Sequence, residues 1–202
     1  MSARVLVASR NAKKLAELRR ILAEADVVGL QVVGLDDVPA YEEAPETGAS
    51  FEENALAKAR DGAAATGLPC VADDSGLEVD ALNGMPGVLS ARWAGAHGDD
   101  AANNALLLAQ LRDVPDERRG ARFVSACALV VPGGRELVVR GIWPGSIGRT
   151  PVGDGGFGYD PLFLPEGGTG SAAQLGPAEK DEASHRGRAL RQLLPALAAL
   201  AN

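Results

Sequence analysis

The 202-residue sequence is poor in aromatic residues and has no long apolar runs. Aromatic side chains make up only 4% of it, so the hydrophobic core must be built mainly from Ala, Leu and Val. No apolar run approaches the roughly 18 residues of a membrane span, and the N-terminus lacks the apolar core of a signal peptide. We therefore expect no membrane segment and a cytoplasmic location.

Cysteine is also scarce, and basic residues are fewer than acidic ones. Cys70 and Cys127 both lie in apolar runs without CxxC spacing, so we expect reduced core thiols rather than a disulfide or a metal pair. The formal net charge of −7 argues against a general nucleic-acid surface, which needs an excess of Lys and Arg. A local basic site for a small anion remains compatible with this charge.

The pattern of apolar and polar residues predicts one α/β domain over residues 1–202, with a mixed sheet. Its composition is 46% hydrophobic and 23% charged, and no repeat or linker divides it, although two lobes would fit. Apolar runs typical of strands alternate with segments of helical period, and Pro132-Gly133-Gly134-Arg135 indicates a hairpin. The expected strands are 4–8, 27–35, 70–72, 77–79, 121–131 and 136–143. The expected helices begin near Ala12, Ser50, Asp99 and Ser184.

A cationic loop follows the first expected strand. Ser9-Arg10-Asn11 leads into a helix with Leu15, Leu18, Ile21 and Leu22 on one face and Lys14 and Glu17 largely on others. A strand, polar loop and helix in this order form an anion site, because the helix N-terminus points at whatever lies above the strand. Arg10, Lys13 and Lys14 are either its cations or solvated surface charges.

Two adjacent carboxylates, Asp73 and Asp74, follow Cys70-Val71-Ala72 where this strand is expected to turn. Since side chains alternate along a strand, the two acids should point to opposite sides. One of them is then a candidate metal ligand or general base, and the alternative is a plain Asp-Ser-Gly turn. The acidic loop before the Ser50 helix, whose Ser50 and Glu53 form a capping box, could bring Glu46 to Asp74 around a divalent cation.

The C-terminal third carries a glycine-rich aromatic loop and a second cationic cluster. Residues 153–161 contain Phe157 and Tyr159, on which a flat heterocycle could stack, or which could simply plug the edge of the core. Lys180 and Ser184-His185-Arg186 precede an amphipathic helix. Cationic loops, paired acids and an aromatic loop together favour hydrolytic chemistry on a nucleotide.

Six motifs, in order, resemble those of the inosine triphosphate pyrophosphatase family, the dITP/XTP pyrophosphatases, over nearly the whole chain. They are Ser9-Arg10-Asn11-Ala12-Lys13-Lys14, Glu46-Thr47-Gly48 with Phe51-Glu52-Glu53-Asn54-Ala55, Ala72-Asp73-Asp74-Ser75-Gly76, Pro86-Gly87 with Ser90-Ala91-Arg92, Gly156-Phe157-Gly158-Tyr159-Asp160-Pro161, and Ser184-His185-Arg186.

The resemblance implies an elongated mixed sheet flanked by helices, with two lobes around a substrate cleft, and a homodimer. It implies Mg²⁺-dependent hydrolysis of ITP, dITP and XTP to the monophosphate and pyrophosphate, which cleanses the nucleotide pool. Neither nucleic acid nor membrane would be a partner. Alternatives are a Maf-type pyrophosphatase acting on pyrimidine or modified nucleotides, and a nucleotide-binding module without turnover.

The resemblance also assigns residues. Asp74 would be the catalytic base and a Mg²⁺ ligand, with Glu46 as a second ligand or its support and Asp73 in an orienting or structural role. Lys58 would be a weaker phosphate candidate, and the doubled Lys13-Lys14 leaves open which lysine reaches phosphate. The substrate-binding residues would be Ser9, Arg10, Asn11, Ala12, Lys13, Lys14, Ser75, Phe157, Gly158, Tyr159, Asp160, Lys180, His185 and Arg186.

Overall fold

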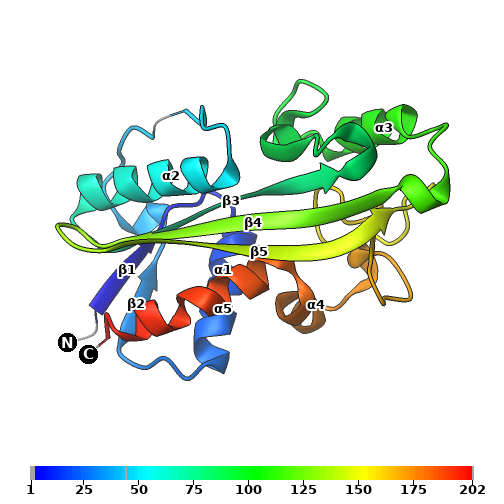
Figure 1. Ribbon diagram of the computed structural model, residues 1–202. Helices are drawn as coiled ribbons and strands as arrows, with labels where there is room; N and C mark the ends of the chain where they lie inside the picture. Colours follow the sequence, from blue (N-terminus) through cyan, green and yellow to red (C-terminus); the bar gives the residue numbers. More distant parts are fainter. Residues whose placement is uncertain (1–2, 44, 202) are drawn as a thin grey trace. The chain divides into compact units, whose positions relative to one another are not determined.

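A computed structural model describes residues 3–43 and 45–201, apart from the side chain of Lys13. Six strands form one mixed sheet in the order β2-β1-β3-β4-β5-β6 (Figure 1). β1 is parallel to β2 and to β3, whereas β6 is antiparallel to β5. The strands are β1 (Ala3–Val7), β2 (Leu30–Val33), β3 (Cys70–Val79), β4 (Gly120–Val130), β5 (Glu136–Ile147) and β6 (Phe163–Pro165). The predicted α/β class with a mixed sheet is confirmed.

Five α-helices accompany the sheet in the described part of the chain. They are α1 (Ala12–Glu24), α2 (Phe51–Thr66), α3 (Asp100–Gln110), α4 (Pro177–Ala183) and α5 (His185–Ala198). Short 3₁₀ helices lie at Leu35–Asp37, Asp80–Leu82, Gly87–Arg92, Asp116–Arg118 and Ala172–Gln174. None of the helices in residues 3–43 and 45–201 has the length and apolar character needed to cross a membrane.

The chain folds into two compact units. Unit 1 comprises the described residues of Met1–Asp74, Ser125–Gly141 and Arg186–Asn202, and unit 2 comprises Ser75–Val124 and Ile142–His185. β3, β4, β5 and α5 each contribute residues to both units. The prediction of a single domain with two lobes stays a prediction.

The core of unit 1 lies between its strands and the helices α1 and α5. Leu18 and Ile21 of α1 pack with Leu193 and Leu197 of α5 against strand residues such as Val5. Figure 1 shows α2 on the opposite side of the strands from α1 and α5. The β3 residues of unit 1 therefore have a helix on each face, as the continuous apolar run Cys70-Val71-Ala72 requires.

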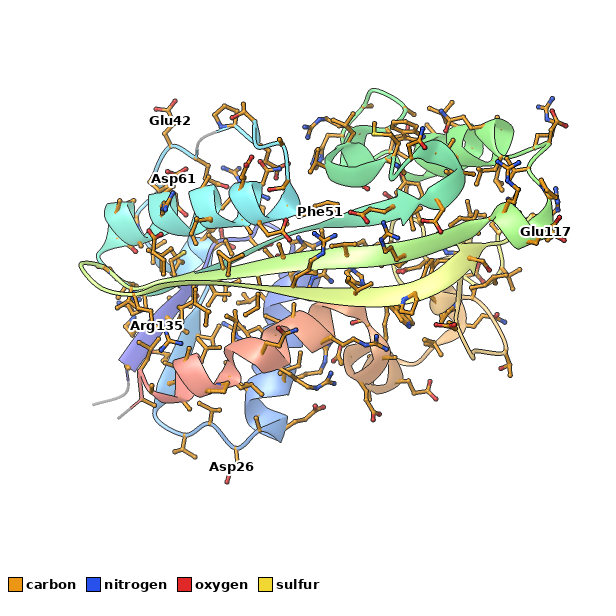
Figure 2. The ribbon with its side chains drawn as sticks, viewed as in Figure 1. Asp26, Glu42, Phe51, Asp61, Glu117 and Arg135 are labelled. Atoms are coloured by element: carbon orange, nitrogen blue, oxygen red, sulfur yellow. The ribbon has the colours of Figure 1, made fainter. Side chains whose placement is uncertain are left out.

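Helix α2 begins with the predicted Ser50 cap but without the reciprocal bond of the predicted capping box, and it ends where its sequence predicts. The Ser50 hydroxyl accepts a hydrogen bond from the Glu53 N–H at 3.2 Å, while the Glu53 carboxylate accepts one from the Ala49 N–H at 2.7 Å rather than from Ser50 itself. Phe51, labelled in Figure 2 at the first turn of α2, is 3% exposed. The helix ends at Gly67 in the left-handed conformation, with φ of 68°.

The core of unit 2 contains half of the few aromatic side chains, namely Phe123, Trp143, Tyr159 and Phe163. The Phe123 ring lies 4.5 Å from that of Phe163, and Trp143 lies 5.3 Å from Phe163, measured between centroids. Leu107 of α3 and Leu111, which follows the helix as its C-cap, are buried in the same cluster. Asp99 caps α3 as predicted, because its carboxylate accepts a hydrogen bond from the Ala102 N–H at 3.0 Å.

Several predicted strands differ from the structure, and the strand expected at 136–143 continues to Ile147 as β5. The strand expected at 27–35 is shorter, because Gly29 with φ of 86° precedes β2 and a 3₁₀ helix follows it. The expected turn at Asp73–Gly76 is wrong: β3 continues to Val79. Gly76 permits a close contact instead of a turn, since a Cβ there would lie 2.3 Å from the Ser90 hydroxyl.

Both thiols are free and buried, and burial raises the pKa of Cys70 and of Cys127 to about 12. The thiolate is the reactive form, and at pH 8 a thiol of that pKa is ionised to roughly one part in ten thousand. We expect iodoacetamide at pH 8 to leave the folded protein unlabelled over an hour and to label both cysteines in urea, as read by intact mass. Prompt labelling of the folded protein would contradict this burial.

Candidate functional site

Asp73 and Asp74 lie side by side on β3, and their side chains point to opposite faces of the sheet as predicted. The two residues are almost equally buried, with 9% of Asp73 and 8% of Asp74 exposed. Asp73 contacts residues of α1 and α5, and Asp74 contacts residues of α2. Burying adjacent acids is costly unless each is paired, so the partners on each face decide what each acid can do.

On the α1 and α5 face, Asp73 belongs to a buried cluster of four charges. Its Oδ2 lies 2.8 Å from the Lys14 Nζ and accepts a hydrogen bond from the Arg186 Nε at 3.1 Å. The other side of the Arg186 guanidinium donates from its Nη1 to the Glu17 Oε2 at 3.0 Å. Two acids and two cations therefore balance, which stabilises charges that would be prohibitive singly.

This balance shifts the pKa values of the Asp73 cluster. Burial alone would raise the pKa of Asp73, but the charges of Lys14 and Arg186 outweigh it and hold that pKa well below its usual range. Burial alone would lower the pKa of Arg186, but Asp73 and Glu17 raise it. The carboxyl group of Asp73 therefore stays ionised, with its charge already paired to Lys14 and Arg186. Glu17, predicted to lie largely off the apolar face of its helix, is nevertheless buried, since it is 7% exposed and bonded to Arg186.

On the α2 face, Asp74 has one amide partner and one shared cation. The Asn54 Nδ2 donates to the Asp74 Oδ2 at 2.9 Å, and the Lys58 Nζ lies 3.5 Å from the Asp74 Oδ1. The same ammonium forms an ion pair with the Glu46 Oε1. Burial raises the pKa of Asp74, and Lys58 and Asn54 only partly offset it. Asp74 is therefore the less stabilised of the two anions.

The amide of Asn54 is held in turn by Gly48. The Gly48 N–H donates to the Asn54 Oδ1 at 2.8 Å, which orients the Nδ2 towards Asp74. A Cβ on Gly48 would lie 2.6 Å from that oxygen, so no larger residue fits without moving Asn54. The acidic loop thus positions the Asp74 carboxylate through one side chain of α2.

Of the three cations predicted in and after the loop Ser9-Arg10-Asn11, the structure places one, Lys14, beside the paired acids. The Ser9 hydroxyl accepts a hydrogen bond from the Asn11 N–H at 3.2 Å, and α1 begins at Ala12. Arg10 is 81% exposed at its side chain and forms an ion pair with Glu43 at 2.8 Å. Lys14 is the loop cation beside the paired acids, while the side chain of Lys13 lies outside the described part of the structure.

The donors around Asp74 suit a metal that takes few protein ligands. Glu46 and Asp74 converge on the Lys58 Nζ, and their predicted convergence on a divalent cation stays a prediction. In residues 3–43 and 45–201 no three His, Cys, Asp or Glu side chains group closely enough to hold an ion by themselves. Mg²⁺ is commonly bound through one or two carboxylates, with phosphates and water completing its octahedron, so this pair fits Mg²⁺ with a phosphorylated ligand.

Unit 2 arranges the glycine-rich loop around Asp160. The Asp160 Oδ2 accepts a hydrogen bond from the Phe157 N–H at 2.7 Å and pairs with the Lys180 Nζ. That ammonium also lies 5.2 Å from the centroid of the Phe157 ring. The Gly158 N–H donates to the Asp100 Oδ2 at 2.6 Å. These hydrogen bonds and the ion pair hold the loop in place, and the Phe157 side chain on it is partly exposed, with 36% of the residue accessible.

The remaining residues predicted in unit 2 are more buried. Tyr159 is 4% exposed and its hydroxyl donates to the Ser90 carbonyl at 2.9 Å, so it is a core ring. His185 stacks on Phe123 with centroids 4.9 Å apart and planes 13° from parallel. Ser75 is partly buried on β3.

The structure thus joins predicted residues within each unit. Unit 1 gathers Lys14, Asp73 and Arg186 on one face and Glu46, Lys58 and Asp74 on the other. Unit 2 gathers Phe157, Asp160 and Lys180. The roles in substrate binding stay predictions.

Two residues that support the site were not among the predicted site residues. Asn54 could have been suspected, because a polar residue follows Glu53 in a helix turn that begins with the buried Phe51. Glu17 carried no such signal, since its partner Arg186 lies 169 positions away in the sequence.

The Asp73 cluster predicts unequal costs for two arginines of α5. Arg186→Met leaves Glu17 and Asp73 buried with only Lys14, so it should lower the free energy of unfolding by about 3–5 kcal/mol. Arg188→Met, on the exposed side of the same helix, should cost less than about 0.5 kcal/mol. Urea denaturation of both variants measures the difference, and equal midpoints would show that the cluster does not stabilise the fold.

The sequence matches the model of the Ham1 family over residues 5–196. It is 86% identical over 200 residues to the dITP/XTP pyrophosphatase of Nocardia farcinica, covering 99% of this chain and 97% of the relative. It is 70% identical over 198 residues to the dITP/XTP pyrophosphatase of Mycobacterium tuberculosis strain H37Rv, covering 98% and 97%.

Solved structures of related proteins align with this fold over nearly their whole length. A HAM1 protein from Coxiella burnetii aligns with a TM-score of 0.86 at 41% identity, over 98% of this chain and 99% of that one. The nucleoside-triphosphatase, dITP/XTP pyrophosphatase, of Mycobacterium abscessus aligns with a TM-score of 0.79 at 70% identity, over 96% and 99%. Because the family model matches residues 5–196 and these alignments are near-complete, the chain belongs to the Ham1 family.

Proposed function

We propose that this protein hydrolyses the non-standard purine nucleoside triphosphates ITP, dITP and XTP to the monophosphate and pyrophosphate, and so cleanses the nucleotide pool. The observation that carries the proposal is the asymmetric pair Asp73 and Asp74, with Lys14 and Lys58 beside it. The name and 86% identity of the Nocardia farcinica relative support the same activity.

Asp74 has the environment of a general base. It is buried, it is oriented by the Asn54 amide at 2.9 Å, and it shares its cation with Glu46. It would take a proton from a water molecule that attacks the triphosphate, as the bond between the nucleotide phosphoryl group and pyrophosphate breaks. Asp73 cannot do the same, because Lys14 and Arg186 stabilise its charged form.

Charge neutralisation would come from the lysines and from a metal. The side chains of Lys14 and Lys58 are 17% and 19% exposed, so both ammonium groups can reach a phosphate ligand. Glu46 and Asp74 would hold Mg²⁺. When bound, the ion would offset phosphate charge and lower the pKa of a coordinated water.

Base recognition would fall to unit 2. Phe157 offers an exposed ring on which a purine could stack. Next to this ring, Lys180 offers a hydrogen-bond donor and Asp160 an acceptor. A keto oxygen at the purine 6-position accepts a hydrogen bond that the amino group of adenine cannot accept. A buried donor left unpaired by adenine would reject ATP strongly.

We also propose that the chain acts as a homodimer in the cytoplasm and with Mg²⁺ as its metal. The support is the family resemblance together with the donor set at Glu46 and Asp74. Nucleic acid is not proposed as a partner, since the net charge of −7 disfavours it.

A pyrophosphate-release panel tests the activity. With Mg²⁺ present, ITP, dITP and XTP should release pyrophosphate faster than ATP and GTP by roughly a hundredfold or more. Coupled detection of pyrophosphate, with a parallel assay for orthophosphate, measures both products.

The same panel separates the alternatives. Preference for dUTP or UTP would indicate a Maf-type enzyme. ITP-dependent thermal stabilisation without any product would indicate a binding module. Release of orthophosphate, or equal rates on all purines, would overturn the proposed function.

A further inference from the structure

Lys58 occupies the centre of the acidic face of unit 1. Its Nζ forms an ion pair with the Glu46 Oε1, lies 3.5 Å from the Asp74 Oδ1 and lies 3.5 Å from the Asp73 carbonyl oxygen. The side chain is 19% exposed and comes from the middle of α2, a rigid element. The carboxylates that would hold a divalent cation are therefore already bonded to an ammonium group.

The charges around Lys58 favour this arrangement. The Lys58 ammonium lies between two carboxylates, those of Glu46 and Asp74, which offset its positive charge. A divalent cation at the same two carboxylates would lie within a few ångströms of this positive charge. The two cations would repel each other strongly at that distance in a partly buried site.

Lys58 also has space into which it can move. A cavity of about 210 Å³ is lined by Lys58, Glu46, Gly48 and Asn54, among others. This volume would hold several water molecules, so the ammonium can leave the carboxylates without repacking α2. Leaving requires another anion to receive its charge, and a triphosphate carries several.

We propose that Lys58 is the resident cation of the Glu46 and Asp74 pair in the substrate-free protein, and that a divalent cation must compete with it. The free protein then binds metal weakly at this pair, and metal binding becomes favourable when phosphate groups draw Lys58 away. The link to phosphate rests on the proposed function, whereas the competition between Lys58 and the metal does not.

Binding of Mn²⁺ to the substrate-free protein tests the competition, with free Mn²⁺ followed by electron paramagnetic resonance. Lys58→Met keeps the length of the side chain and removes its charge, so it should lower the Kd for Mn²⁺ by roughly tenfold or more. Adding Asp74→Asn to that variant should abolish the gain, which places the ion at this pair.

Arg60→Met is the matched control. Arg60 lies on the same helix and its loss changes the net charge equally, but it pairs with Glu136 on the exposed surface at 2.7 Å. It should leave the Mn²⁺ affinity unchanged within about twofold. Lys58→Gln repeats the test if the methionine variant folds poorly, as judged by circular dichroism.

Two results would overturn the proposal. One is an unchanged Mn²⁺ affinity in folded Lys58→Met and Lys58→Gln variants, and the other is an equal gain in Arg60→Met. Failure of the proposed function would look different, because it would appear as absent pyrophosphate release from the parental protein. The Mn²⁺ titration contains no nucleotide and is independent of that result.

Discussion

The site depends on the alternation of side chains along β3, which separates two adjacent buried carboxylates. In a strand, neighbouring residues face opposite sides of the sheet. Asp73 and Asp74 therefore meet different helices, although their Cα atoms are neighbours. Had they shared a face, two buried negative charges would have raised each other's pKa and neither would stay reliably ionised. The alternation along the strand therefore keeps the two charges apart, whichever residues pair with them.

The two faces then differ in how fully they compensate charge. Asp73 has two cations, and the further acid Glu17 restores neutrality on its face. Asp74 shares one lysine with Glu46 and is otherwise oriented by a neutral amide. The first arrangement ties α1, β3 and α5 together and resists change. The second retains net negative charge beside an ammonium that can move, which is the condition for binding a metal and a polyanion.

Much of the fold could be predicted because its signals are local. The helical period of α1, the Ser50 cap of α2, the hairpin at 131–135 and the opposite directions of Asp73 and Asp74 all follow from neighbours in the sequence. The turn predicted at Gly76 was wrong, because in the sequence a glycine that permits close approach to Ser90 looks the same as a glycine in a turn. Glu17 could not be assigned, since a glutamate on a charged helix is buried only through a partner distant in sequence.

One comparison tests the division of labour between the two acids most directly: urea denaturation and turnover of Asp73→Asn and Asp74→Asn, measured side by side on one purine triphosphate. Asp73→Asn should lose about 3–5 kcal/mol of unfolding free energy, because its cations lose their counter-charge. Asp74→Asn should unfold within about 1 kcal/mol of the parental protein and lose roughly 10²–10⁴ in kcat. Equal stability losses, or near-parental turnover by Asp74→Asn, would contradict the account.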